Sequence, residues 1–163
     1  MFEARAIESA AKPDFYRELH RQLTGLFEGE ADPIANAANT SALIYQLLPE
    51  LNWAGFYFLR GSELVLGPFQ GKPACVRIAV GQGVCGTAVA RGQSVLVEDV
   101  HAFPGHIACD AASRSELVVP FFRDHAVVGV IDLDSPIPAR FDADDRAGIE
   151  GVAELYVRCS GRG

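Results

Sequence analysis

The sequence predicts a single α+β domain in which a mostly antiparallel sheet of about six strands is covered by helices from the two ends of the chain. Three observations lead to this fold class. The chain has 163 residues, enough for one compact core and short for two. Apolar residues recur at helical spacing near both ends. Between these ends, short runs of aromatic and branched residues are separated by tight turns, and strands connected in this way pair antiparallel.

Two helices are predicted in the N-terminal part of the chain. The first ends before Gly29, and the second begins at Asp32 and Pro33, because aspartate caps a helix N-terminus and proline fits its first turn. Pro49 follows the end of the second helix. The first helix has a continuous apolar face, formed by Phe15, Leu19, Leu23, Leu26 and Phe27.

The middle of the chain contains the predicted strands, at residues 53–59, 63–66, 76–80, 94–98, 116–122 and 127–132. Residues 60–62 form a hairpin tip, and residues 84–90 have the small side chains of a short helix. A final helix begins near Asp142 and carries Ile149, Val152, Ala153, Tyr156 and Val157 on one face. We therefore expect one domain over residues 1–163, with its core at about residues 15–157.

The segment between the fourth and fifth predicted strands, residues 99–115, is irregular and long for so small a domain. It contains proline, glycine, histidine and Cys109. Long loops of this kind are commonly binding loops, so we expect functional residues here.

Charge and hydropathy exclude several classes of function. The chain has 21 acidic and 14 basic residues and a net charge of −7, which disfavours binding to nucleic acid or to anionic membranes. No apolar run approaches the roughly 18 residues that span a bilayer. Residues 1–12 lack a signal-peptide core. These features predict a cytoplasmic protein.

Four cysteines, Cys75, Cys85, Cys109 and Cys159, are too few for a disulfide scaffold. They form no CxxC pair and have no finger-like spacing with the histidines, so no metal site is expected. In a reducing compartment such thiols are either buried apolar groups or redox groups. Their number alone favours burial.

Three carboxylates lie on the predicted strands or at their ends. Asp132 and Asp134 point to one face, because side chains alternate along a strand, and Glu116 begins the preceding strand. Carboxylates that share a face repel one another unless they hold an ammonium group, a metal ion or a shared proton. The alternative is a solvent-exposed strand end.

Trp53 and Tyr57 also share one face of a predicted strand, with Gly55 leaving room between their rings. They form either an aromatic wall for a small apolar group or part of an ordinary core.

Glycines 81, 83 and 86 match a dinucleotide-binding spacing, but the flanking strands are predicted antiparallel and the expected acidic residue is missing. These glycines therefore indicate a tight strand-to-helix turn.

Six short motifs occur in order and together resemble the free methionine-(R)-sulfoxide reductases, a family built on the GAF domain. They are Asn52-Trp53-Ala54-Gly55-Phe56-Tyr57, Gly67-Pro68-Phe69-Gln70-Gly71, Ala74-Cys75-x-Arg77-Ile78, Gly81-x-Gly83-Val84-Cys85-Gly86, His106-Ile107-Ala108-Cys109-Asp110 and Ile131-Asp132-Leu133-Asp134-Ser135. The resemblance runs from about Phe15 to Tyr156.

The resemblance implies a role for each matched residue. Cys109 matches the nucleophile that becomes a sulfenic acid, Cys75 the cysteine that then forms a disulfide with it, and Cys85 an auxiliary third thiol. The residues matched to the substrate pocket are Glu116, Asp132 and Asp134, with Trp53 and Tyr57 as its aromatic wall. Cys159 has no counterpart in the family.

The resemblance also implies the substrate and the partners. It predicts reduction of free methionine (R)-sulfoxide, recycling of the enzyme by thioredoxin, no bound cofactor, and a homodimer, because members of the family often form dimers. Two other functions fit a GAF domain: a module that binds a small ligand without catalysis, and a redox sensor whose disulfide forms without turnover.

Overall fold

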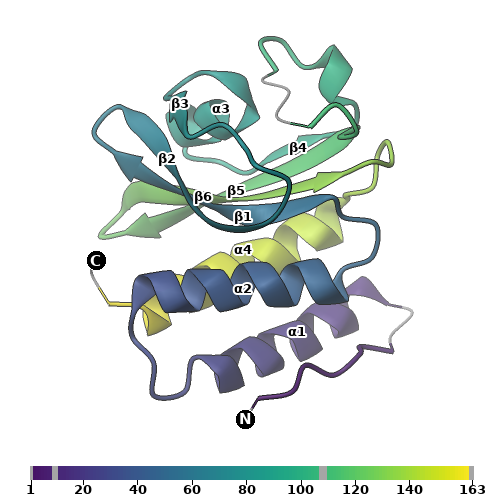
Figure 1. Cartoon of the computed structure of the whole chain (residues 1–163), viewed down its shortest axis with the longest axis vertical. Helices are drawn as coiled ribbons and strands as arrows, with labels where there is room; N and C mark the ends of the chain where they lie inside the picture. The colour runs from purple at the N-terminus through teal and green to yellow at the C-terminus, as the bar shows by residue number, and fades with distance from the viewer. Residues whose placement is uncertain (1, 9–10, 107–109, 162–163) are drawn as a thin grey trace.

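The computed structural model describes residues 2–8, 11–106 and 110–161. The predicted nucleophile, Cys109, lies outside the described residues. Figure 1 shows a sheet through the middle of the molecule, with α2 and α4 against one face and α3 on the other. The predicted α+β class is confirmed.

In the described part of the chain the helices are α1 Lys12–Leu26, α2 Pro33–Leu47, α3 Gly83–Arg91 and α4 Ala143–Cys159, with a short 3-10 helix at Val100–Ala102. The strands are β1 Trp53–Arg60, β2 Glu63–Gly71, β3 Arg77–Ala79, β4 Val95–Val97, β5 Ser115–Arg123 and β6 Ala126–Ser135. They form one sheet in the order β3-β2-β1-β6-β5-β4, and every neighbouring pair is antiparallel.

Two helices begin where the sequence predicted them. The Asp32 carboxylate accepts the backbone N–H groups of Ile34 and Ala35 at the start of α2. At α4, Asp142 and Asp145 form a capping box, in which each side chain accepts the other residue's backbone N–H. Each such cap stabilises its helix by about 1 kcal/mol.

The larger part of the core lies between the sheet and the helices α2 and α4. Its centre is a cluster of aromatic rings: Phe56 of β1 and Phe121 of β5 lie 4.8 and 5.4 Å from the Tyr156 ring of α4. Helix α1 forms an outer layer (Figure 1). The Tyr16 ring of α1 lies against Gly148 of α4. The sheet is thus covered by α2 and α4, while α1 packs mainly on α4.

Strand pairing sets the positions of the predicted site residues. Trp53 of β1 lies opposite Asp134 of β6, and Asp134 lies opposite Glu116 of β5. Asp132 pairs with Gly55 of β1 in the same way. Because side chains alternate along each strand, all of these residues face α3 rather than the helical core.

Several strand boundaries differ from the sequence prediction, and β6 continues to Ser135, three residues beyond its predicted end. β2 continues to Gly71, well beyond residue 66, because it keeps pairing with β1 across an irregularity between Gly55 and Tyr57. β3 contains only Arg77–Ala79.

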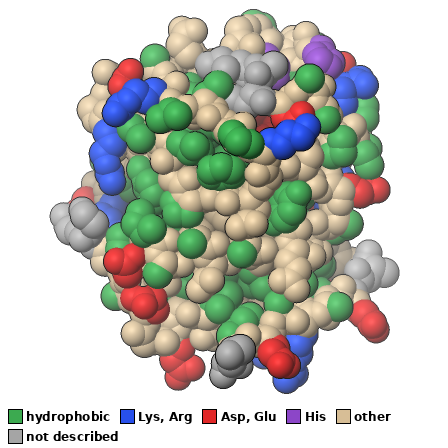
Figure 2. All heavy atoms as spheres, in the orientation of Figure 1, with side chains coloured by type: hydrophobic (Ala, Val, Ile, Leu, Met, Phe, Trp, Pro, Cys, Tyr) green, Lys and Arg blue, Asp and Glu red, His purple; other side chains and the backbone are tan. Residues whose placement is uncertain are grey.

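Across the described ranges, no helix has the length and apolar character needed to cross a membrane. On the face seen in Figure 2, acidic and basic side chains are interspersed rather than gathered into a basic patch.

Candidate active site

A cavity of about 40 Å³ lies between the sheet and α3, under the segment that follows β4. Six of the predicted site residues line it: Trp53, Tyr57, Cys85, Glu116, Asp132 and Asp134. This volume holds about one to three water molecules. Residues more than 80 positions apart in sequence therefore meet in one small space, as the strand register requires.

One wall of the cavity is aromatic. The Trp53 ring stacks between Tyr57 and Phe69, with ring centroids 5.9 and 5.2 Å away. Gly55 makes this arrangement possible, because a Cβ atom there would lie 2.7 Å from Trp53 Cη2 and 2.4 Å from Phe69 Cβ. The Trp53 indole N–H donates to the backbone carbonyl of Lys72. Trp53 and Tyr57 are also buried members of a core cluster, which confirms the core interpretation of this pair, while their role as a wall for a ligand stays a prediction.

The neighbouring residues of β5 and β6 form an acidic wall of the cavity, and burial keeps most of its carboxyl groups neutral. Burial raises the pKa values of Glu116 and Asp134 well above their ordinary values, and repulsion from Asp132 adds to the effect. Burial raises the pKa of Asp132 less, to about 6, because hydrogen bonds from Cys85 and Glu116 stabilise its carboxylate. At neutral pH the site therefore contains neutral carboxylic acids beside one ionised Asp132. The alternative of a solvent-exposed strand end is wrong for Asp132, which is buried, and Asp134 is half-buried and lines the cavity.

Cys85 is in the first turn of α3, fully inside the protein. Its thiol donates to Asp132 Oδ2 across 3.4 Å. Burial and the neighbouring carboxylates raise the pKa of the Cys85 thiol well above its usual value, so this sulfur is a thiol at neutral pH and a weak nucleophile. A potential ligand atom from each of Cys85, Glu116 and Asp132 lies within 4.8 Å of the others.

The three spaced glycines place Cys85 at this depth. Gly81 and Gly83 have φ values of +87° and +61°, a backbone region that favours glycine. At Gly86 an added Cβ would lie 2.4 Å from the Ala79 carbonyl oxygen. The motif is thus the predicted strand-to-helix turn, in an antiparallel sheet.

The other cysteines are placed differently. Cys75 is half-buried, and its backbone carbonyl accepts the Tyr57 hydroxyl, while the adjacent Ala74 lines the cavity. Cys159 is at the end of α4 and packs against the helical core, away from the cavity. Within the described residues, Cys85 and Cys159 are free thiols.

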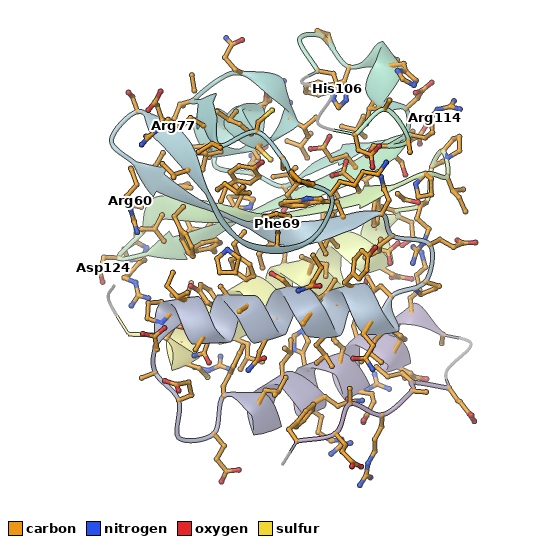
Figure 3. The ribbon with its side chains drawn as sticks, in the orientation of Figure 1. Arg60, Phe69, Arg77, His106, Arg114 and Asp124 are labelled. Atoms are coloured by element: carbon orange, nitrogen blue, oxygen red, sulfur yellow. The ribbon has the colours of Figure 1, made fainter. Side chains whose placement is uncertain are left out.

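Sequence reasoning assigned no role to several polar residues at the rim. The Asn52 amide donates to Asp110 and to the Ser113 hydroxyl, and the Lys72 ammonium lies 3.3 Å from Asp110. His106 comes from the segment above the sheet, on the side of α3 (Figure 3), and its Nδ1 lies 3.8 Å from Glu116 Oε2. Asn52, His106 and Asp110 lie within the family motifs, and their place in these motifs was the sequence signal that could have pointed to a functional role.

Comparison with known proteins shows which family this chain belongs to. The family model described as "GAF domain" matches residues 34–158. The free methionine-R-sulfoxide reductase of Escherichia coli is 56% identical over 145 residues, covering 88% of each chain. The protein YtsP of Bacillus subtilis is also 56% identical, over 93% of this chain and 94% of its own. The chain belongs to the free methionine-R-sulfoxide reductase family of GAF domains.

A solved structure of a member of this family agrees in fold. The free methionine-R-sulfoxide reductase of Neisseria meningitidis, in complex with its substrate, is 42% identical and superimposes with a TM-score of 0.93, covering 98% of this chain and 95% of that one. The GAF fold and the family predicted from the six motifs are thereby confirmed. The individual roles of the cysteines and carboxylates stay predictions.

Proposed function

We propose that this chain reduces free methionine (R)-sulfoxide to methionine. The reductases from E. coli and N. meningitidis, similar to this chain over most of its length, support this proposal. The observation that carries it is the pairing of neutral carboxylic acids with an ionised carboxylate beneath an aromatic wall. A sulfoxide of an amino acid needs such a combination, because its oxygen must be protonated while its ammonium group must be neutralised.

Each charged end of the amino acid has a candidate partner in the lining of the cavity. Asp132 is ionised at neutral pH, and its buried Oδ1 has no hydrogen-bond partner among the residues described, so it can accept the substrate ammonium. Lys72 is the one Lys or Arg among the described lining residues, and it can pair with the substrate carboxylate. Main-chain N–H groups of residues 99–115 are a second candidate for the carboxylate.

Glu116 is the candidate proton donor. A sulfoxide sulfur is a poor electrophile until its oxygen is protonated or strongly hydrogen-bonded. Burial keeps Glu116 neutral at physiological pH, so it can donate to the sulfoxide oxygen where an ordinary glutamate could not. The aromatic wall of Trp53 and Tyr57 would hold the substrate's methyl group and methylene chain.

The redox steps follow the roles that the family resemblance assigns. The Cys109 thiolate attacks the sulfoxide sulfur, the oxygen transfers to Cys109 as a sulfenic acid, and methionine leaves. The Cys75 thiol then displaces water from the sulfenic acid and forms a disulfide. A dithiol such as thioredoxin reduces that disulfide and is itself oxidised, so each cycle consumes one sulfoxide and one dithiol and releases one water. Cys85 is auxiliary, consistent with its raised pKa.

The lining of the cavity favours a free amino acid over a peptide. Lys72 at its rim is 70% exposed, so its side chain can move to admit a substrate. A site that holds both charged ends of the substrate has no place for the peptide bonds of a protein-bound residue. No bound cofactor is needed for this chemistry, and a cytoplasmic homodimer remains our expectation.

The proposal is tested by thioredoxin-coupled NADPH oxidation with free (R)- and (S)-methionine sulfoxide. We expect turnover on the R form and its loss in Cys109→Ser. The Cys75→Ser variant should complete roughly one turnover and then stop when no small thiol is present. Binding without turnover would support the ligand-binding alternative, and a disulfide that forms without methionine release would support the redox sensor.

A further inference from the structure

We propose that the same cavity is also a binding site for a thiophilic divalent cation, and that Zn²⁺ is the ion its ligand set fits best. The cysteine and histidine spacing predicted no metal site, because spacing detects ligands that are close in sequence. Here the candidate ligands come from three separate elements: Cys85 from α3, Glu116 from β5 and Asp132 from β6.

The distances among these ligand atoms suit a tetrahedral ion. With Zn–S near 2.3 Å and Zn–O near 2.1 Å, a tetrahedral site separates sulfur from oxygen by about 3.6 Å. Cys85 Sγ and Asp132 Oδ2 are 3.4 Å apart, and the third ligand atom, from Glu116, lies within 4.8 Å of both. Shifts of about 1 Å would therefore complete the three-ligand set.

Two buried atoms that lack partners point to a ligand at this place. Asp132 is 7% exposed and lines the cavity, yet its Oδ1 has no hydrogen-bond partner in the described ranges. His106 Nδ1 is likewise buried and without a hydrogen bond among the described residues, and it lies 3.8 Å from Glu116 Oε2. A ring nitrogen in this position can supply the fourth ligand, or a water molecule in the cavity can do so.

The chemistry of the ligands selects among metals. A thiolate and an imidazole favour zinc and other borderline or soft ions. Mg²⁺ and Ca²⁺ require about six or more oxygen ligands, far more than two carboxylates supply. Binding of the dication would displace the protons of Cys85 and Glu116 and would neutralise the anionic ligands that this leaves. A cavity of about 40 Å³ accommodates one ion and a water molecule without rearrangement.

Direct titration tests the site without any turnover. Chelator-treated, reduced protein is titrated with ZnCl₂ in a calorimeter, and we expect one equivalent per chain. Cys85→Ser should bind at least about 100-fold more weakly, because even residues that only support a ligand change affinity by 10- to 100-fold. Cys159→Ser is the matched control and should bind as the wild type does. Unchanged affinity in Cys85→Ser, or a loss in Cys159→Ser, would overturn the assignment.

Co²⁺ as a probe identifies the sulfur ligand. Thiolate coordination gives an intense ligand-to-metal charge-transfer band, expected in the wild type and absent in Cys85→Ser. If Cys85→Ser does not fold by circular dichroism, Asp132→Asn decides, since it preserves the side-chain shape and should weaken Co²⁺ binding at least about 100-fold. Wild-type protein without the band, or Asp132→Asn with undiminished affinity, refutes the proposal.

One consequence rests on the proposed function: Zn²⁺ would occupy the space needed by the sulfoxide. Inhibition should then be competitive with methionine sulfoxide and reversed by a chelator. Because binding is measured without substrate, failure of the zinc site and failure of the reductase activity give different results. Noncompetitive inhibition with intact one-to-one binding would refute this consequence alone.

Discussion

Replacing Asp132 by asparagine removes an ionisable group from the buried acidic wall while keeping its shape. Burial raises the pKa of Asp132 from 3.8 to about 6. A folded-state pKa above the unfolded value means that the native protein binds the proton more tightly, so this group's contribution to stability is present below about pH 4 and lost as pH rises through about 6. A shift of about two units corresponds to about 3 kcal/mol.

The expected result is a difference that changes with pH. Between about pH 4 and pH 6 the free energy of unfolding of the wild type should fall relative to Asp132→Asn by about 1.4 kcal/mol per pH unit. Repulsion from Asp132 contributes to the raised pKa values of Glu116 and Asp134, so these pKa values should fall in Asp132→Asn, which adds to the difference in the same direction at higher pH.

Urea denaturation at half-unit pH intervals measures this difference. Asp144→Asn is the matched control, because Asp144 is exposed in the first turn of α4. Its unfolding free energy should follow the wild-type pH profile. A constant difference between wild type and Asp132→Asn, or one that grows in the opposite direction, would refute the electrostatic description of the pocket.

Three further substitutions test separate parts of the site. Gly55→Ala places a Cβ 2.4 Å from Phe69 Cβ, so the free energy of unfolding measured in urea should fall by about 1–3 kcal/mol and KM should rise. Gly25 in α1 has room for a Cβ, so the control Gly25→Ala should neither lower the free energy of unfolding nor raise KM. Glu116→Gln should lower kcat by about 100-fold or more with little change in KM, and an unchanged kcat would exclude Glu116 as proton donor. Lys72→Ala should raise KM about tenfold at constant kcat; equal KM values would assign the substrate carboxylate to main-chain N–H groups instead.

The strand pattern predicted most of what positions the site. The alternation of side chains along a strand predicted that Asp132 and Asp134 share one face of their strand. It predicted the same for Trp53 and Tyr57, because alternation is a local property of each strand. The Asp32 and Asp142 caps were equally local. These features were therefore readable from the sequence alone.

The contacts across elements were not readable in this way. The bond between Cys85 and Asp132 depends on how α3 sits over β6, and the rim contacts of Asn52 and Lys72 with Asp110 depend on two loops meeting. No spacing in the sequence encodes these distances. The position of α1 outside α2 and α4 was missed for a similar reason, since an amphipathic face does not say which surface it packs against.

The central claim is that sulfoxide oxygen is transferred to Cys109 in a pocket formed by the acidic and aromatic walls. The most direct measurement treats Cys75→Ser with one equivalent of free methionine (R)-sulfoxide and a sulfenic-acid-trapping dione, followed by mass spectrometry of the peptides. We predict one dione adduct, on Cys109, together with one equivalent of methionine. An adduct on Cys85 with none on Cys109, or methionine formed with no adduct at all, would contradict the account.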